Sequence, residues 1–97
     1  MTGEAWVTVP VPGLSLANRG PHPAVDRAMF ALSLAERRAA VLEVFDVGGR
    51  RRWSRDLPGR DLTFDAVIET SALEPGIYRV RLRQGATAVS AKLLVVR

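Results

Sequence analysis

The sequence predicts an all-β domain, an immunoglobulin-like antiparallel β-sandwich of about seven strands. Apolar and polar residues alternate along most of the chain, and a period of two is typical of strands buried on one face. Turn-forming Gly and Pro recur roughly every 8–12 residues, which is typical of sandwiches and barrels. The length of 97 residues suits one domain, and the 47% hydrophobic content suits a packed core rather than disorder.

The N-terminal part of the chain is set apart by Pro10, Pro12 and Gly13. We predict that residues 1–13 form a linker or a short entry strand, Ala5–Val9, and that the sandwich occupies residues 14–97. Leu14 and Leu16 predict a short first strand at the start of the sandwich.

Two strands follow, each with its apolar residues on one face. Their inward sets are Ala28, Phe30, Leu32 and Leu34 for the second strand, and Ala40, Leu42 and Val44 for the third. The polar segment Ala35–Arg38 separates them as a turn. Glu43 falls on the outer face of the third strand, where we expect it to pair with an arginine, worth up to about 1 kcal/mol.

The middle of the chain reads as a hairpin and a return strand. Asp46–Gly49 is predicted to be a tight turn, because Gly adopts positive φ without penalty. Arg51–Leu57 is predicted as an edge strand, and Pro58-Gly59 turns the chain again. Alternating apolar residues then predict a fifth strand, with Leu62, Phe64, Ala66 and Ile68 on one face.

The last third of the chain predicts a final hairpin. Glu74-Pro75-Gly76 forms a turn because Pro fixes one φ and Gly adopts the unusual one beside it. Tyr78, Val80 and Leu82 should then face inward. The outward set of this strand is Ile77, Arg79, Arg81 and Arg83. The closing strand should bury Val89, Ala91, Leu93 and Val95 and leave Lys92 in solvent.

The composition of the chain limits the kinds of site, partner and location that it can have. The chain has no Cys, which excludes disulfides and thiolate metal sites. Its formal charge of +4 favours an anionic partner. No apolar run reaches the roughly 20 residues of a transmembrane helix. The first twelve residues carry Glu4 where a signal peptide would be basic, so no export signal is recognised and the chain is expected to be cytoplasmic or a piece of a longer precursor.

Three segments together resemble the C-terminal sorting domain of type IX secretion cargo, the type A sorting domain. The first is Pro21-His22-Pro23-Ala24-Val25-Asp26 with the alternating strand after it. The second runs from Leu42 through Phe45-Asp46 to Gly48-Gly49-Arg50. The third is Leu73-Glu74-Pro75-Gly76-Ile77-Tyr78 followed by alternating residues, then Lys92-Leu93-Leu94-Val95. The order and spacing agree from Leu14 to the last residue.

The chain departs from this family in one position of the first segment, where His22 stands in place of the usual Asn. A sister family, the immunoglobulin-like domain of the flagellar hook-capping protein, shares much of the pattern. That family usually carries Trp-Asp-Gly before its Gly-x-Tyr strand, where this chain has residues 68–73 instead. The difference favours the sorting-domain resemblance.

The resemblance implies a non-catalytic signal that directs a cargo protein across the outer membrane to the cell surface. It implies that the partner is the outer-membrane secretion machinery, that a cargo domain lies upstream in the same polypeptide, and that the location is secreted or on the outer-membrane surface. No membrane insertion and no nucleic acid are expected. The candidate partner-binding residues are Lys92, Arg79, Arg81, Gly49 and Arg50. The candidate structural motif residues are Pro21, Pro23, Asp26, Gly76 and Tyr78.

No catalytic, metal or cofactor site is expected. His22 is the one histidine and lies between two prolines, so it is interpreted as a turn residue rather than a general base. Asp61, Asp65 and Glu69 are spaced at four and are interpreted as a solvated strand face, because no cleft or metal-binding loop is indicated.

Two alternatives remain for the function. One is a structural or adhesive immunoglobulin-like module of an extracellular or hook-capping-type protein. The other is a small nucleic-acid binder that would use Arg50, Arg51, Arg52 and Arg55 around Trp53. The same arginines also suit an edge strand that avoids pairing with other chains.

Overall fold

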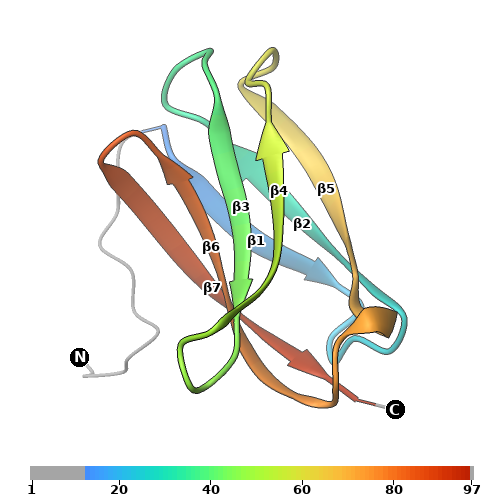
Figure 1. Ribbon diagram of the computed structural model, residues 1–97. Coiled ribbons are helices and arrows are strands. Elements are labelled where there is room, and N and C mark those ends of the chain that lie inside the picture. Colours follow the sequence, from blue (N-terminus) through green and yellow to red (C-terminus); the bar gives the residue numbers. More distant parts are fainter. Residues whose placement is uncertain (1–12, 97) are drawn as a thin grey trace, which may run out of the picture.

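The computed structural model describes residues 13–96, which form seven strands and one short 3₁₀ turn (Figure 1). The elements are β1 Ser15–Gly20, β2 Arg27–Ser33, β3 Ala40–Phe45, β4 Arg51–Leu57, β5 Thr63–Glu69, η1 Thr70–Ala72, β6 Gly76–Gln84 and β7 Thr87–Val95. The predicted entry strand Ala5–Val9 lies outside the described residues. No helix in residues 13–96 is long and apolar enough to cross a membrane.

The strands form two antiparallel sheets packed face to face, with order β1-β2-β5 in one and β4-β3-β6-β7 in the other. The predicted all-β, immunoglobulin-like sandwich of about seven strands is therefore confirmed. β4 is an edge strand, as predicted. β7 runs beside the entry to β2 and forms a parallel bridge between Ala24 and Val95.

The core fills the space between the two sheets, and the alternation in the sequence produces it. The largest fully buried side chains include Phe30 and Ile68 from one sheet and Leu42, Leu82 and Leu93 from the other. Burial of each contributes roughly 1.5–3 kcal/mol relative to exposure. The predicted inward sets of β2, β3 and β6 are all buried, and Ala91 of β7 packs partly buried against the core.

The corner before β6 is held by a side chain rather than by a regular turn alone. The Tyr78 hydroxyl donates a hydrogen bond to the Glu74 backbone carbonyl, four residues upstream. This is the tyrosine corner found in many immunoglobulin-like sandwiches. Gly76 begins the strand two residues before it. Tyr78 thus ties the start of β6 to the backbone of the preceding turn.

The segment that contains Pro21 and Pro23 leads into β2. The Gly20–Pro21 and His22–Pro23 peptide bonds are cis. The Asp26 backbone carbonyl accepts hydrogen bonds from the amides of Thr70 and Ser71 at 2.9 and 3.1 Å. Asp26 thus fixes η1, a short 3₁₀ turn that period-two alternation does not reveal.

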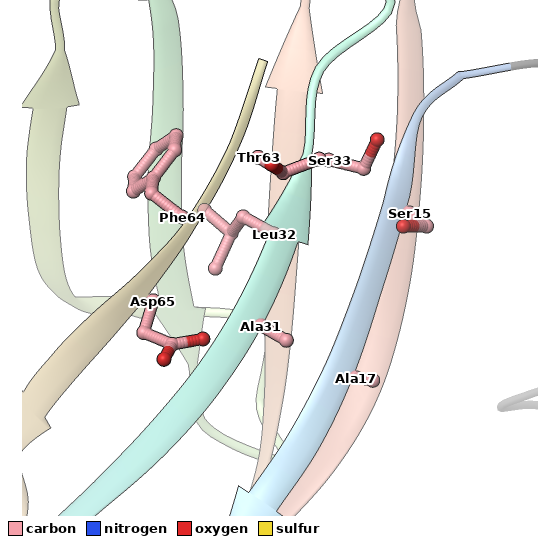
Figure 2. A pocket seen from close by; sticks show the side chains of 8 residues that line it. All are labelled: Ser15, Ala17, Ala31, Leu32, Ser33, Thr63, Phe64 and Asp65. Atoms are coloured by element: carbon pink, nitrogen blue, oxygen red, sulfur yellow. The ribbon is translucent and has the colours of Figure 1, made fainter. Parts of the chain in front are cut away.

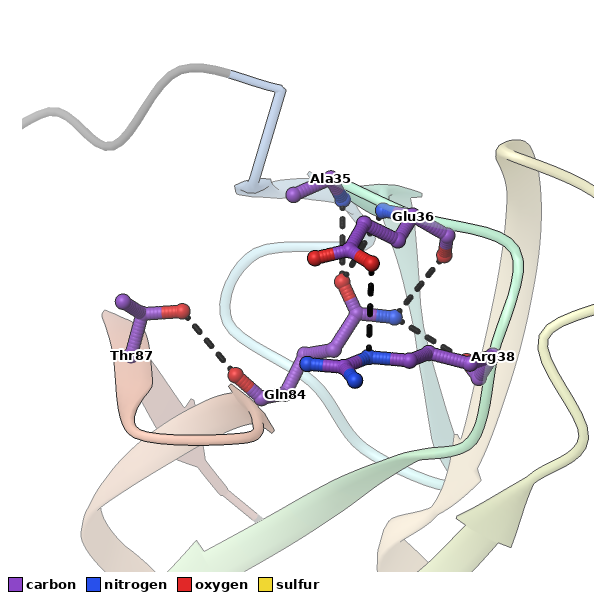
Figure 3. A network of polar contacts seen from close by, with 5 residues as sticks. All are labelled: Ala35, Glu36, Arg38, Gln84 and Thr87. Atoms are coloured by element: carbon purple, nitrogen blue, oxygen red, sulfur yellow. Dashed lines mark hydrogen bonds and ion pairs between the residues drawn. The ribbon is translucent and has the colours of Figure 1, made fainter.

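Three connections meet at the opposite end of the sandwich, around the buried Gln84 side chain (Figure 3). Its Oε1 accepts from the amides of Ala35 and Glu36, both at 3.1 Å. Its Nε2 donates to the carbonyls of Glu36 and Arg38, both at 2.9 Å. One amide side chain thereby satisfies four backbone groups and ties the β2–β3 connection to the end of β6.

Gly59 lies against the same connection. Its φ is +78°, and a Cβ placed there would lie 1.9 Å from the Arg38 carbonyl oxygen. Two connections far apart in sequence, β2–β3 and β4–β5, therefore pack backbone to backbone at a position that only glycine allows.

Candidate functional site

The outer face of the four-stranded sheet gathers most of the predicted partner-binding residues. Antiparallel register places Arg51, Phe45, Arg79 and Lys92 in one row across β4, β3, β6 and β7. The next row contains Glu43 opposite Arg81, and the third contains Val41 opposite Arg83. We call this surface the arginine face and define it by Arg51, Arg79, Arg81, Arg83 and Lys92 with Glu43 and Phe45 between them.

Glu43 anchors the centre of the arginine face. It points away from the core, yet it is only 2% exposed because arginine side chains cover it. Arg81 donates from Nη2 at 2.9 Å and from Nε at 3.1 Å to the same carboxylate oxygen. Arg51 reaches the other oxygen at 3.3 Å, and Arg83 Nε lies 3.7 Å from the first. The predicted pairing of Glu43 with an arginine is confirmed, with three arginines rather than one.

The protonation of Glu43 follows from these contacts. Burial alone raises the pKa of the Glu43 carboxyl. Hydrogen bonds from Arg81 and Arg51, together with the charges of Arg81 and Arg83, outweigh burial and lower its pKa below the ordinary value of 4.5. The carboxylate is therefore ionised at neutral pH and holds the guanidinium groups in place.

Phe45 fixes the position of two of the arginines. The Arg81 guanidinium carbon lies 4.7 Å from the centre of the Phe45 ring, and that of Arg79 lies 5.3 Å from it. Both distances are within the range of cation–π attraction, worth about 0.5–1 kcal/mol at exposed sites. The half-buried Phe45 ring thus contacts two guanidinium groups of the arginine face.

The arginine face carries more positive charge than its carboxylates balance. The five cations share this face with two carboxylates, Glu43 and Asp56. Asp56 lies on β4, opposite Val41 of β3. Within residues 13–96 neither Arg79 nor Lys92 forms an ion pair with a carboxylate. The surface is therefore an ordered, cationic sheet face suited to an anionic partner.

The predicted residues Gly49 and Arg50 lie beside this face, in the β3–β4 hairpin. Asp46 Oδ1 accepts from the amides of Gly48 and Arg50, both at 2.9 Å, and Gly49 has φ +87°. The Arg50 backbone hydrogen bond is the main reason that the pKa of Asp46 is lowered. Gly49 thus serves the turn itself, whereas the Arg50 side chain is highly exposed.

Trp53 lies on the inner side of β4 and is not part of the arginine face. Register pairs it with the core residue Val44, and it is half-buried against the core. Of the arginines around it, Arg51 lies on the outer face, whereas Arg55 occupies a register position on the same side as Trp53.

The other candidate groups lie apart from one another. His22 is exposed, and its Nδ1 lies 3.5 Å from Asn18 Nδ2. Asp65 and Glu69 lie exposed on the outer face of β5, and Asp61 is exposed before that strand. In the described part of the chain no three His, Cys, Asp or Glu residues are grouped to hold a metal ion.

Comparison with known proteins identifies no relative, since no family model matches the chain and no curated protein matches it. The resemblance to the sorting domains rests on the three sequence segments alone.

Proposed function

We propose that this chain is a non-catalytic, immunoglobulin-like sorting domain that directs a cargo protein across the outer membrane through contacts of its arginine face. The cargo would be a domain upstream in the same polypeptide, and the partner would be the outer-membrane secretion machinery. The destination would be the cell surface or the medium.

The observation that carries this proposal is the row of Arg79 and Lys92 beside Arg81. These three residues come from the two strands of the third segment that resembles sorting domains, and antiparallel pairing brings them onto one solvent-facing surface. Glu43 and Phe45 hold two of them in fixed positions before any partner arrives. Preorganised charges lose little conformational entropy on binding, which favours a recognition role.

A delivery assay tests the proposal. The full chain is fused behind an exported reporter in a host with a type IX secretion system, and reporter at the cell surface is measured. Replacement of both Arg79 and Lys92 by Ala should sharply reduce surface delivery. Arg19→Ala, an exposed cation on the other sheet, should leave it unchanged and is the matched control.

The outcome also decides between function classes. Protease resistance of the fusion in the periplasm shows that the domain has folded. A folded fusion that stays in the periplasm contradicts the sorting role and favours a structural or adhesive immunoglobulin-like module.

A further inference from the structure

β5 is an edge strand of the three-stranded sheet. The alternation of hydrogen bonds between β2 and β5 shows which backbone groups of β5 face the open edge. The Leu34 amide donates to the Leu62 carbonyl at 2.7 Å, and the Thr70 amide donates to Asp26 at 2.9 Å. Hydrogen-bonded pairs recur at every second residue of an antiparallel ladder. Phe64, Ala66 and Ile68 therefore bond to β2. The N–H and C=O groups of Thr63, Asp65 and Val67 point away from β2, toward the open edge.

The two edges of the four-stranded sheet, β4 and β7, carry protection that β5 lacks. β4 has an irregular register beside Phe45, and Arg55 occupies a register position that faces the other sheet. The β7 edge is covered where Ala24 bonds with Leu94 and Val96 and where the Asn18 side chain reaches the Lys92 carbonyl. By contrast, β5 pairs over seven residues without a bulge, contains no Pro or Lys, and turns only apolar residues inward. Such an edge is a template for an added strand.

The two sides of this edge differ in chemistry. On the outer face Asp65 is exposed, and its neighbour on β2 is Ala31 rather than a cation. Small side chains of β1 and β2 leave a hollow of about 370 Å³ beside it, as Figure 2 shows. On the inner side, a hollow of about 240 Å³ at the mouth of the sandwich is lined in part by Leu57, Pro58 and Phe64.

We propose that the open edge of β5 binds an extended polypeptide segment as an added strand, and that basic and apolar residues alternate in this segment. The free backbone groups of Thr63, Asp65 and Val67 supply the main-chain hydrogen bonds. Basic side chains of the segment lie opposite Asp65 on the outer face, and apolar ones cover the mouth beside Phe64. The inference is independent of the sorting role.

A second copy of this chain is a poorer occupant. When β5 pairs with itself, the Asp65 and Glu69 carboxylates of both copies come onto the same face of the joined sheet. Like charges on neighbouring strands are destabilising. Charge complementarity therefore favours a basic segment from another polypeptide.

A peptide titration tests the inference on the full chain. The probe is a blocked peptide in which lysine and valine alternate, and the matched control peptide has glutamate in place of lysine. Amide NMR shifts should be largest at Asp65 and Val67, and hydrogen exchange of these amides should slow on binding. The glutamate peptide should bind at least about tenfold more weakly, the equivalent of about 1.4 kcal/mol.

Two substitutions separate the backbone from the charge. Val67→Pro removes an edge N–H that takes no part in pairing with β2, and it should weaken lysine-peptide binding about tenfold or more, whereas Val67→Ala should not. Asp65→Lys should reverse the preference between the two peptides. If Val67→Pro fails to fold, backbone N-methylation of alternate peptide residues makes the same test.

Several results would overturn the inference. One is binding that neither Val67→Pro nor Asp65→Lys changes. Another is a set of amide shifts centred on the arginine face or on β7 instead of β5. A third is concentration-dependent dimerisation in sedimentation that Val67→Pro abolishes, because it would show that the occupant is a second copy.

Discussion

Glu43 and Arg81 face each other across adjacent strands, and two nitrogens of the guanidinium bond to a single carboxylate oxygen at 2.9 and 3.1 Å. The pair lies on the outer face of the sheet, yet its carboxylate is buried. It therefore combines the strength of a shielded ion pair with a position on the surface where a partner would bind.

The replacement Glu43→Gln should destabilise the fold by about 1.5–3 kcal/mol, the range for hydrogen bonds that involve charged groups. The amide keeps the size of the side chain but leaves three arginines around a neutral group. Urea unfolding of both proteins at pH 7 measures the loss. Equal stability would show that the carboxylate does not hold the arginine face together.

The contribution of Glu43 should depend on pH in a defined direction. Because the folded-state pKa is lowered from 4.5, the stabilisation is present above that value and is lost as pH falls through the folded pKa. The stability difference between the wild type and Glu43→Gln should thus shrink as the solution is acidified below about 4.5. A difference that stays constant or grows in acid would contradict the assigned cause.

The closing strand should separate packing from surface chemistry at neighbouring positions. Leu93 is fully buried, so Leu93→Ala should cost about 2–5 kcal/mol through lost burial and the cavity left behind. Lys92 is exposed, and Lys92→Ala should change stability by no more than about 0.5 kcal/mol. Thermal unfolding of the two variants side by side makes the comparison.

The tyrosine corner should be worth a measurable part of the stability. Tyr78→Phe removes the hydroxyl that bonds to the Glu74 carbonyl and leaves the ring in place. The expected loss is about 0.5–1.5 kcal/mol, a typical net value for one hydrogen bond. Chemical denaturation measures it, and an unchanged midpoint would mean that water replaces the hydroxyl at no cost.

Two glycines with similar backbone angles should respond differently to alanine. Gly49→Ala meets no atom within 4 Å and should lose about 1–2 kcal/mol from positive φ alone. Gly59→Ala also drives a Cβ into the Arg38 backbone, so its loss should exceed that of Gly49→Ala by at least about 2 kcal/mol. Similar losses at the two sites would show that the β2–β3 connection moves aside easily.

Period-two alternation predicted the strands and most of the residues that face inward, because each strand buries one face. Leu62, predicted on the same face as Phe64 and Ala66, is instead exposed just before β5. It could not predict the partners of each strand. Trp53 shows the consequence, since only its register opposite Val44 reveals that it packs on the core side. Gln84 lies at the β6–β7 hairpin, and its buried amide also organises a connection far away in sequence, which alternation does not reveal.

The arginine face was predictable in its composition but not in its construction. The sequence alone assigns Arg79, Arg81 and Lys92 to outward positions, and the register then adds Arg51 and Phe45 to the same row. The burial of Glu43 was not predictable, because it depends on arginines from two neighbouring strands that lie over it. The open edge of β5 likewise follows from the strand order and not from any motif.

The strand order also determines how the chain must search for its native state. Phe30 pairs with Ala66 and Val44 pairs with Val80, so each of these central pairings closes a loop of 36 residues. These contacts cannot form by successive pairing outward from a tight turn. The chain therefore loses the entropy of loop closure before burial of the core stabilises the pairing. Folding of this sandwich should therefore take milliseconds to seconds rather than microseconds. The β3–β4 and β6–β7 hairpins should become stable only when β3 pairs with β6.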